Sequence, residues 1–333
     1  MSKIKVGIIG LGVGEQHIEG YQKHPDCEVT ALCDFSKEKL AMAREKYPDK
    51  KITDNANEIL EDPEINVVSI ASYDNYHYEQ IVKAIEHDKH IFVEKPLCLY
   101  EDHAKYIKSL LKKKQLKMSS NLILRKCPRF RLVQKLIKEG KFGRLFHIES
   151  DYNYGRLNKI TGGWRGKIDF YSVILGGGIH IIDLMLWLVG EDIDEVAAYG
   201  NSIASEKTNF RYNDMVVSVL KFNNGMVGKI SANFGCIMPH FHSLSIYGTN
   251  ATFINGLEYG MLFESRDPAD GYKKITTPYP GVHKGDFLFG FVDSILNGSR
   301  DEVSQDDIFK SMSVCFAIEK AANQSTSVKV NYL

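Results

Sequence analysis

The sequence predicts an α/β protein in which a doubly wound parallel sheet is followed by an α+β domain with a large, mainly antiparallel open sheet. Two observations lead to this prediction. Apolar strands alternate regularly with helices up to about residue 122, and beyond that point longer strands follow one another with partial alternation of apolar and polar residues. A chain of 333 residues is longer than a domain with a single hydrophobic core usually is, so we expect two domains, at 1–122 and 123–333.

The first domain is predicted from its alternating pattern. Strands are expected at 3–9, 29–33, Ile52, 67–71, 90–94 and 117–122, and helices at 14–23, 37–47, 56–60, 78–87 and 100–114. The strand at 67–71 is almost continuously apolar, which is typical of a parallel strand that helices cover on both faces. Strands separated by helices in this way predict a parallel sheet.

The second domain is predicted to be richer in strands. Strands are expected at 145–154, 196–203, 215–222, 226–234, 243–247, 251–254 and 261–264, and helices at 127–139, 179–188, 287–296 and 306–323. The tripeptide Asn223-Asn224-Gly225 lies between two of these strands and predicts a hairpin turn.

The composition excludes several classes of partner. The 42 basic residues balance the 42 acidic ones, which gives no reason to expect nucleic acid or an anionic membrane. No apolar run approaches the ~20 residues of a membrane span, and the N-terminal residues enter a strand without a signal peptide. The six cysteines are scattered and form no CxxC pair, so we expect free thiols in the cytoplasm.

A glycine-rich turn follows the first strand. In Gly10-Leu11-Gly12-Val13-Gly14, glycines permit a tight turn and let main-chain N–H groups approach a pyrophosphate at a helix N-terminus. Asp34 ends the second strand, where a carboxylate binds a ribose 2′-hydroxyl. This context predicts a Rossmann domain that binds NAD rather than NADP, because Asp34 would repel a 2′-phosphate. A packing role for the turn, a helix-capping role for Asp34 and a phosphate site at Ser36 and Lys37 are the alternatives.

Polar residues also follow two later strands. Ser72, Asn75 and His77 come after the strand at 67–71 and are expected to border the cofactor, with a solvent-facing helix cap as the equal alternative for His77. Glu94-Lys95-Pro96 closes the strand at 90–94. A lysine at the carboxyl end of a parallel strand faces the crevice where open α/β sheets bind ligands, and the proline restricts its backbone to extended conformations.

An ordered set of motifs covers nearly the whole chain. It comprises the glycine turn, Asp34, Asn75-Tyr76-His77, Glu94-Lys95-Pro96, Asn121…Arg125…Pro128, Trp164-Arg165, Gly176-Gly177-Gly178-Ile179-His180-Ile181-Ile182-Asp183 and Trp187-Leu188-Val189-Gly190. This set resembles the Gfo/Idh/MocA oxidoreductase family. The resemblance implies a Rossmann domain, with Glu94, Lys95 and Asn121 near the cofactor. It also implies a sheet domain whose open face often forms an oligomer interface, here of a homodimer or homotetramer. The implied activity is reversible oxidation of a sugar, cyclitol or similar secondary alcohol.

The glycine run leads to a histidine suited to that activity. His180 and Asp183 lie three residues apart and share one face of a helix. Oxidation of an alcohol requires removal of the hydroxyl proton, a task that suits histidine because its unperturbed pKa is about 6.5. We therefore expect His180 as general base, Lys95 as electrostatic and proton-relay partner, and Asp183 as a group that orients His180 or the substrate. A buried helix with one satisfied histidine is the alternative.

One position departs from the family pattern. Many sugar-oxidising members carry an aspartate four residues before this histidine, where the present chain has Gly176. Either Asp183 covers part of that role, or contacts to the substrate come from elsewhere.

Other polar residues are candidates for binding the substrate. Trp164, Arg165 and Tyr171 precede the glycine run and are expected to line the cleft, with Arg165 reaching a cofactor or substrate anion. A surface loop with one buried tryptophan is the alternative. Tyr154 ends a sheet strand and offers a hydroxyl of the kind that binds polyols.

Two further clusters leave alternatives open. Arg125, Arg129 and Arg131 either accept phosphate or a nucleotide sugar, or form a solvated helix face. His240-x-His242 places two imidazoles on one face of an extended segment, but no third ligand is evident, so we expect polar wall residues and no metal.

The leading hypothesis is an NAD(P)-dependent oxidoreductase that transfers a hydride between a nicotinamide cofactor and a sugar, sugar derivative or cyclitol. One alternative is a redox glycosidase of the same family, in which tightly held NAD transiently oxidises the sugar and no net NADH forms. The other is a dinucleotide-binding regulator without turnover, which the glycine at position 176 motivates. The presence of both Lys95 and His180 favours catalysis.

Overall fold

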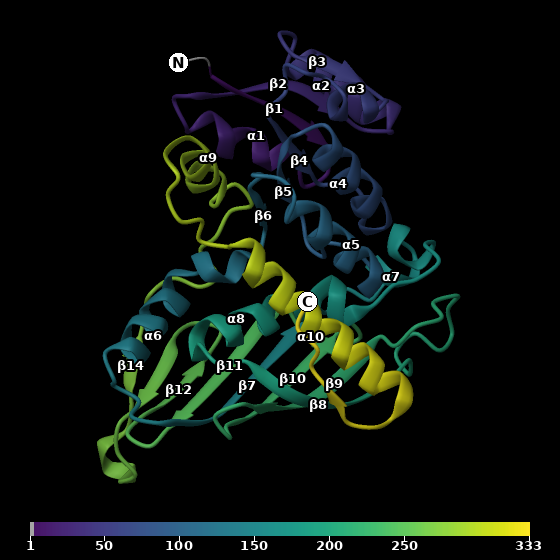
Figure 1. The fold of residues 1–333 in the computed structure, drawn as a ribbon. Coiled ribbons are helices and arrows are strands. Elements are labelled where there is room, and N and C mark those ends of the chain that lie inside the picture. Colours follow the sequence, from purple (N-terminus) through teal and green to yellow (C-terminus); the bar gives the residue numbers. More distant parts are fainter. Residues whose placement is uncertain (1–2) are drawn as a thin grey trace. The chain divides into compact units, whose positions relative to one another are not determined.

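The computed structural model describes residues 3–333, and the chain forms two compact units (Figure 1). The first comprises the described residues up to Ile123 together with His283–Phe309 and Leu333. The second comprises Leu124–Val282 and Lys310–Tyr332. The expected first domain also includes residues 1 and 2, which lie outside the described residues. The expected second domain includes 283–309, whereas the structure returns this segment to the first unit.

The first unit contains a six-stranded parallel sheet in the order β3-β2-β1-β4-β5-β6. The strands are β1 (Ile4–Ile9), β2 (Cys27–Cys33), β3 (Lys51–Thr53), β4 (Val67–Ile70), β5 (His90–Val93) and β6 (Met118–Ser120). The helical segments are α1 (Glu15–Gln22), α2 (Lys37–Lys46), α3 (Asn57–Leu60), η1 (Asp74–Tyr76), α4 (His77–Glu86), α5 (Glu101–Leu111) and α9 (Leu288–Asn297). This strand order is that of a doubly wound sheet, in which ligands bind outside the carboxyl ends of the strands.

The segment His283–Phe309 joins the first unit because α9 packs closely against α1. Two glycines make this approach possible, since a Cβ on Gly20 would lie 2.7 Å from the Cα of Gly285. The ring of Phe291 on α9 packs against Phe92 of β5, with 5.6 Å between the ring centres. The order of elements along the chain carries no sign of this return, so the sequence offers no reason to assign the segment to the first unit.

The second unit contains a nine-stranded sheet in the order β14-β13-β12-β11-β7-β10-β9-β8-β15. The strands are β7 (Leu145–Asn153), β8 (Ile193–Asn201), β9 (Met215–Phe222), β10 (Val227–Asn233), β11 (Phe241–Gly248), β12 (Thr252–Asn255), β13 (Gly260–Phe263), β14 (Lys273–Ile275) and β15 (Val328–Lys329). Strands β7 and β10 pair in parallel, and the other neighbours pair antiparallel. The predicted fold class is therefore confirmed.

Helices cover one face of this second sheet. The helical segments are η2 (Ile123–Lys126), α6 (Pro128–Lys138), α7 (Asn158–Thr161), η3 (Trp164–Gly166), the π-helical turn η4 (Ile174–Gly178), α8 (Ile179–Val189), η5 (Pro268–Asp270) and α10 (Gln305–Gln324). Helices α6, α8 and the part of α10 from Lys310 onward lie over one face, and no helix among residues 3–333 covers the other (Figure 1).

Local signals placed most elements but missed the shortest ones. The predicted hairpin at Asn223-Asn224-Gly225 is confirmed: Gly225 has a φ of +85°, and Phe222 N–H donates to the carbonyl oxygen of Met226 at 2.9 Å. The segments α7, β14 and β15 were not predicted, because two to four residues are too short to show a periodicity.

The described chain contains no helix with the length and hydropathy that crossing a bilayer requires. All six cysteines are free thiols, as predicted, and five of them are buried.

Candidate active site

The glycine turn between β1 and α1 leaves no room for a side chain at two of its glycines. Gly10 has a φ of +92°, and a Cβ there would collide with the main chain of Ala71 at the end of β4. A Cβ on Gly14 would collide with the carbonyl oxygen of Gly10. At Gly12 the nearest atom to an added Cβ is Nζ of Lys39, at 3.6 Å, so the main chain is bare there. A bare main chain at the N-terminus of a helix fits a pyrophosphate, which binds N–H groups and the positive end of the helix dipole.

Asp34 ties this turn to the end of β2. Its buried carboxylate accepts hydrogen bonds from the main-chain N–H groups of Leu11 (2.7 Å) and Ser36 (2.8 Å), and Nζ of Lys39 lies 3.1 Å away. The N-cap of α2 is Ser36, whose hydroxyl accepts from Lys39 N–H at 3.4 Å. The alternative reading of Asp34 as the helix cap is therefore wrong, and its carboxylate lies beside the glycine turn.

His77 connects two loops at the carboxyl edge of the first sheet. Its side chain is fully buried, with Nδ1 2.7 Å from the carbonyl oxygen of Pro96 and Nε2 3.2 Å from that of Ser72. The Ser72 hydroxyl donates to Gln80 Oε1 at 2.7 Å, and Asn75 is exposed. A solvent-facing cap at His77 is therefore wrong, because the residue links the loop after β4 to the loop after β5.

Glu94, at the end of β5, is the centre of a buried polar network. Its Oε1 accepts a hydrogen bond from Asn121 Nδ2 at 2.7 Å and lies 3.3 Å from His17 Nε2, whose Nδ1 contacts the Ser69 hydroxyl at 2.9 Å. Nζ of Lys284 lies 3.9 Å from Oε2. Burial by itself would raise the pKa of the Glu94 carboxyl, but the charge of Lys284 and the contact with His17 outweigh it and hold that pKa well below its usual range.

Lys95 follows this network directly. It is half-buried, and the backbone on either side of it is anchored. Glu94 N–H donates to the carbonyl oxygen of Ile70 at 2.8 Å, and the carbonyl oxygen of Pro96 contacts His77. The ammonium group of Lys95 is thus carried by a fixed strand end at the ligand-binding edge of the first sheet.

In the second unit, His180 lies at the start of α8, immediately after the π-helical turn Ile174–Gly178. It is 6% exposed. Its ring stacks on Tyr152 of β7 with 6.1 Å between centres, and lies 6.4 Å from His242 of β11. The rings of His240 and His242 are 4.7 Å apart, and Tyr154 packs edge-on to His240 at 5.3 Å. We call these five side chains the imidazole–tyrosine cluster.

Tyr279 anchors one side of this cluster. Its hydroxyl oxygen accepts the main-chain N–H of His242 at 2.7 Å and lies 2.8 Å from Nδ1 of the same residue. Burial raises the pKa of both Tyr152 and Tyr279, so both side chains remain neutral hydroxyls.

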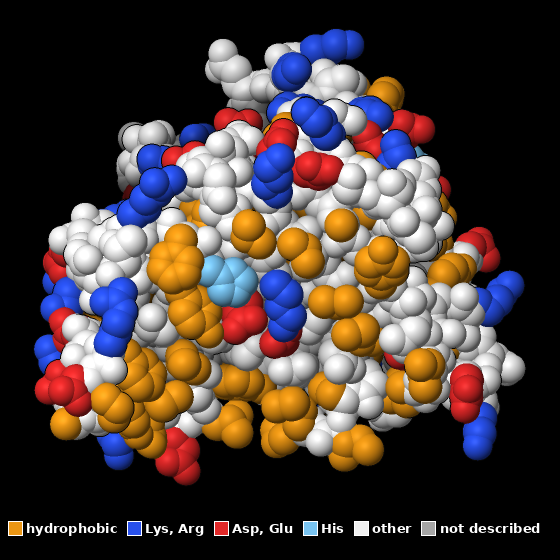
Figure 2. Space-filling view, turned by 90° about the horizontal axis from the view of Figure 1, so that it is seen from below, with side chains coloured by type: hydrophobic (Ala, Val, Ile, Leu, Met, Phe, Trp, Pro, Cys, Tyr) orange, Lys and Arg blue, Asp and Glu red, His pale blue; other side chains and the backbone are white. Residues whose placement is uncertain are grey.

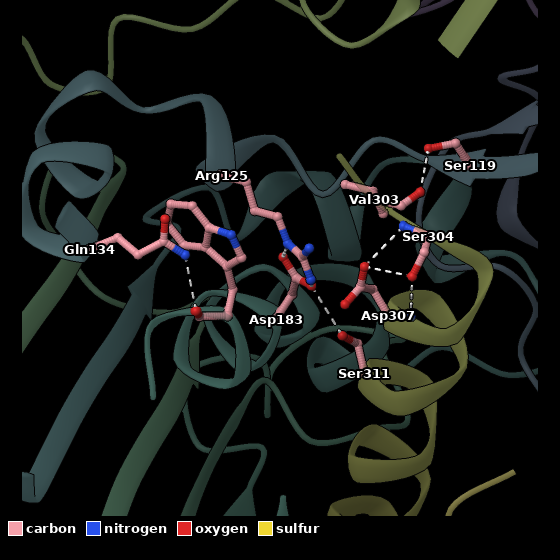
Figure 3. Close-up of polar contacts among 9 residues, drawn as sticks. Ser119, Arg125, Gln134, Asp183, Val303, Ser304, Asp307 and Ser311 are labelled. Atoms are coloured by element: carbon pink, nitrogen blue, oxygen red, sulfur yellow. Dashed lines mark hydrogen bonds and ion pairs between the residues drawn. The ribbon is translucent and has the colours of Figure 1, made fainter. Parts of the chain in front are cut away.

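Asp183 and Arg125 form a buried bidentate ion pair. Nε of Arg125 donates to Oδ2 at 2.9 Å and Nη2 donates to Oδ1 at 2.6 Å, and the Ser311 hydroxyl of α10 reaches Oδ1 at 3.3 Å (Figure 3). Asp183 is 0% exposed and Arg125 5%. These contacts lock η2 onto α8. They pair Asp183, which we expected to orient His180 or the substrate, with Arg125, which we expected to contact the substrate.

The other members of the arginine cluster separate. Arg129 is buried and donates to Asn255 Oδ1 and to the carbonyl oxygens of Thr277, Gly256 and Glu258, all at 2.8–2.9 Å, whereas Arg131 is exposed. A solvated helix face that includes Arg125 and Arg129 is therefore wrong. The sequence shows the positive charge of Arg129 but not the carbonyl groups of distant loops that accept its hydrogen bonds.

The expected substrate residues before the glycine run lie in the second unit. Trp164 and Arg165 are half-buried in η3, and the guanidinium of Arg165 lies 4.5 Å from the centre of the Trp164 ring. Tyr154 is half-buried and Tyr171 is 1% exposed. A Cβ on Gly176 would collide with the Tyr171 hydroxyl and lie 2.7 Å from its Cζ. Tyr171 therefore fills the space that a side chain at position 176 would need.

Several residues of these networks were missed. Lys284 belongs to the segment that returns to the first unit, so nothing in chain order relates it to Glu94. His17 lies three residues after Gly14 on α1, a spacing that places both on one helix face, but only the structure shows that this face meets the end of β5. No group of three or more His, Cys, Asp or Glu side chains in the described part of the chain has the arrangement to hold a metal ion.

Two family models match the chain. Residues 4–122 match the oxidoreductase family with an NAD-binding Rossmann fold, and residues 130–254 match the GFO/IDH/MocA C-terminal domain. The chain belongs to the GFO/IDH/MocA oxidoreductase family. The resemblance inferred from the motifs is thus confirmed, as are the enzyme class, an NAD(P)-dependent oxidoreductase, and the NAD cofactor of its Rossmann domain. The open glycine turn and the carboxylate of Asp34 fit that cofactor.

Curated relatives and solved structures agree with the family. Myo-inositol 2-dehydrogenase of Thermotoga maritima is 22% identical over 98% of both chains, and levoglucosan dehydrogenase of Pseudarthrobacter phenanthrenivorans is 26% identical over 78% of this chain and 75% of its own. Among solved structures, a levoglucosan dehydrogenase in complex with NADH and L-sorbose superposes with a TM-score of 0.86 at 22% identity, over 99% of each chain. A scyllo-inositol dehydrogenase from Lactobacillus casei with bound NAD(H) and scyllo-inositol gives 0.79 at 20% identity, also over 99% of each chain.

The buried ion pair gives a direct test of its structural role. Arg125→Ala removes the guanidinium that pairs with the buried Asp183 carboxylate, so the free energy of unfolding should fall by about 3–5 kcal/mol, as measured by urea denaturation. The double substitution Arg125→Met/Asp183→Leu should recover most of this loss. The exposed Lys138→Ala serves as control and should change stability by no more than about 0.5 kcal/mol. A loss from Arg125→Ala as small as the control would contradict the assignment.

Proposed function

We propose that the protein is an NAD-dependent dehydrogenase that oxidises, or in reverse forms, a secondary alcohol of a sugar or cyclitol. The observation that carries this proposal is the pair of candidate proton-handling residues on a family fold: Lys95 at the ligand-binding edge of the Rossmann sheet, and His180 within the imidazole–tyrosine cluster. Relatives named as inositol and levoglucosan dehydrogenases support the substrate class.

The proposed mechanism requires Lys95 and His180 to reach the same hydroxyl. Nε2 or Nδ1 of His180 accepts the hydroxyl proton, and the ammonium group of Lys95 stabilises the negative charge that develops on the oxygen. When bound, NAD would supply the acceptor for the hydride on the carbinol carbon. In the reverse direction the protonated imidazole returns its proton to the oxygen. Burial of His180 excludes competing water from the base.

The proposed cofactor contacts come from the first unit, except that of Arg165, which belongs to the second. The main chain of Gly10, Gly12, Val13 and Gly14 binds the pyrophosphate, and Asp34 binds the ribose hydroxyls. Ser72, Asn75 and His77 border the cofactor from the loop after β4. Glu94 and Asn121 act through the buried network that fixes Lys95, and Arg165 is proposed to meet an anionic group.

The proposed substrate contacts combine hydroxyls with aromatic surfaces. Tyr154 and Trp164 present ring faces on which the C–H face of a sugar ring packs, while phenol and imidazole groups bind its hydroxyls. Arg125, whose guanidinium pairs with Asp183, remains a proposed substrate contact. Tyr171 lies deeper, against Gly176, and bounds the site rather than opening onto it.

The open face of the second sheet supports the proposal of a homo-oligomer, a dimer or tetramer. Hydrophobic side chains gather over this face (Figure 2), and Tyr199, Val219 and Val227 are 64%, 52% and 45% exposed. Between the apolar residues, Asp151 accepts hydrogen bonds from Lys229, Ser231 and Ser243, so this charge is already neutralised. A symmetric contact between two such faces would bury apolar area while Asp151 keeps its hydrogen-bond partners.

Lys95 provides the test of the catalytic proposal. Lys95→Ala should lower turnover of a sugar or cyclitol substrate by about 10²–10⁴-fold, because it removes the charge that stabilises the alkoxide. Affinity for NAD, measured by calorimetry, should largely survive. The exposed Lys113→Ala is the matched control and should leave both quantities unchanged. Near-normal turnover in Lys95→Ala would refute the mechanism.

Asp34 tests the cofactor preference. Asp34→Ala removes the carboxylate that binds ribose hydroxyls and repels a 2′-phosphate, so KM should rise more for NAD than for NADP. The comparison of the two cofactors separates this effect from general loosening of the glycine turn, which would raise both equally. The exposed Lys113→Ala is again the control. An unchanged ratio of the two KM values would show that Asp34 does not set the preference.

The sheet face tests the oligomer. Val219→Glu/Val227→Glu places charges on the open face and should shift the mass measured by light scattering toward the monomer. The control is Ile203→Glu, since Ile203 is 70% exposed but lies in a loop after β8. A wild-type protein that is monomeric at micromolar concentration, or an oligomer that survives the double substitution, would contradict an interface at this face.

A further inference from the structure

Ser172 holds the backbone of the turn that leads to His180. Its Oγ accepts hydrogen bonds from the main-chain N–H groups of Ile174 at 3.1 Å and Leu175 at 3.0 Å. Its carbonyl oxygen accepts a hydrogen bond from the main-chain N–H of Gly176 at 2.8 Å. Ser172 is 3% exposed. One buried serine therefore accepts hydrogen bonds from three successive N–H groups at the start of the π-helical turn.

Glu319 of α10 completes this arrangement from a distant part of the chain. The hydroxyl of Ser172 donates to Glu319 Oε1 at 2.5 Å. A serine hydroxyl has one proton and two lone pairs. Because the proton goes to Glu319, both lone pairs face the N–H groups of Ile174 and Leu175, and the full bonding capacity of the hydroxyl is used. Burial raises the pKa of the Glu319 carboxyl, against the opposing effect of the bond from Ser172.

The turn held in this way is packed closely against two tyrosines. A Cβ on Gly176 would collide with the hydroxyl of Tyr171, and a Cβ on Gly177 would lie 2.7 Å from Cδ1 of Tyr152. Tyr152 in turn stacks on His180. A shift of the turn would therefore displace the ring against which the proposed base rests.

We propose that Ser172 and Glu319 are positioning residues for His180, acting through the π-helical turn at 174–178. The inference rests on the proposed function, because it assigns to the turn the task of placing the base. A π-helical turn is an irregularity often found at functional sites, and its less favourable backbone geometry needs external hydrogen bonds to persist. A misplacement of about 1 Å in a reacting group can cost 10²-fold in rate.

Four variants test this contact. Ser172→Ala and Glu319→Ala should each lower kcat by about 10–100-fold, while KM for NAD stays unchanged because the glycine turn lies in the other unit. Glu319→Gln should retain most of kcat, since its amide oxygen accepts the same hydrogen bond. The double substitution Ser172→Ala/Glu319→Ala should cost no more than the larger single effect, as expected for two groups that act as one unit. The control is Ser294→Ala, a buried serine that donates only to a carbonyl of its own helix.

Hydrogen exchange gives a second readout that does not depend on turnover. The amides of 174–178 should exchange faster in Ser172→Ala and Glu319→Ala than in the wild type, while the amides of the first unit keep their protection. Losses of kcat that add, or a Glu319→Gln variant as poor as Glu319→Ala, would overturn the positioning role. A wild-type protein without turnover would contradict the proposed function. Unchanged exchange at 174–178 in Ser172→Ala and Glu319→Ala would separately contradict the claim that this contact holds the turn.

Discussion

The need to satisfy one buried carboxylate organises the first unit around its candidate site. Glu94 lies at the end of a central strand, where an unpaired charge would be costly. Its partners come from α1 (His17), from the end of β6 (Asn121) and from the returning segment (Lys284). These contacts hold together the elements that surround the strand end, and Lys95 is the next residue along the chain.

In the second unit, buried polar groups are satisfied by a different set of contacts. Helix α8 carries His180 near its start, and α10 contributes on both sides of that residue. Ser311 reaches the Asp183 carboxylate, and Glu319 reaches Ser172 before the π-helical turn. Polar side chains inside a helical layer fix rotation and register more sharply than apolar packing does, because a misplaced partner leaves a buried group unsatisfied. The proposed base therefore belongs to a helix with few alternative positions.

The features of this fold fall into two groups: those that depend on neighbouring residues and those that depend on distant contacts. The glycine turn, the apolar strand at 67–71 and the Asn223-Asn224-Gly225 hairpin depend on neighbouring residues, and each was predicted. The return of 283–309 to the first unit depends on two glycines where the turn before α9 meets α1, which no periodicity reveals. In the sequence alone, Arg125 resembles a surface charge, and only the structure shows that it pairs with the buried Asp183. The same limit applies to position 176: the sequence shows a missing side chain, whereas the structure shows Tyr171 filling its space.

Transfer of a label from substrate to cofactor tests the central claim most directly. The wild-type protein would be incubated with NAD and a panel of sugars and inositols deuterated at their carbinol carbons, and NADH would be analysed by mass spectrometry. We expect deuterated NADH with at least one ring polyol. Calorimetric binding of NAD without label in the cofactor from any panel member would contradict a dehydrogenase. Release of sugar from a glycoside without net NADH would identify a redox glycosidase, and binding without any turnover would identify a regulator.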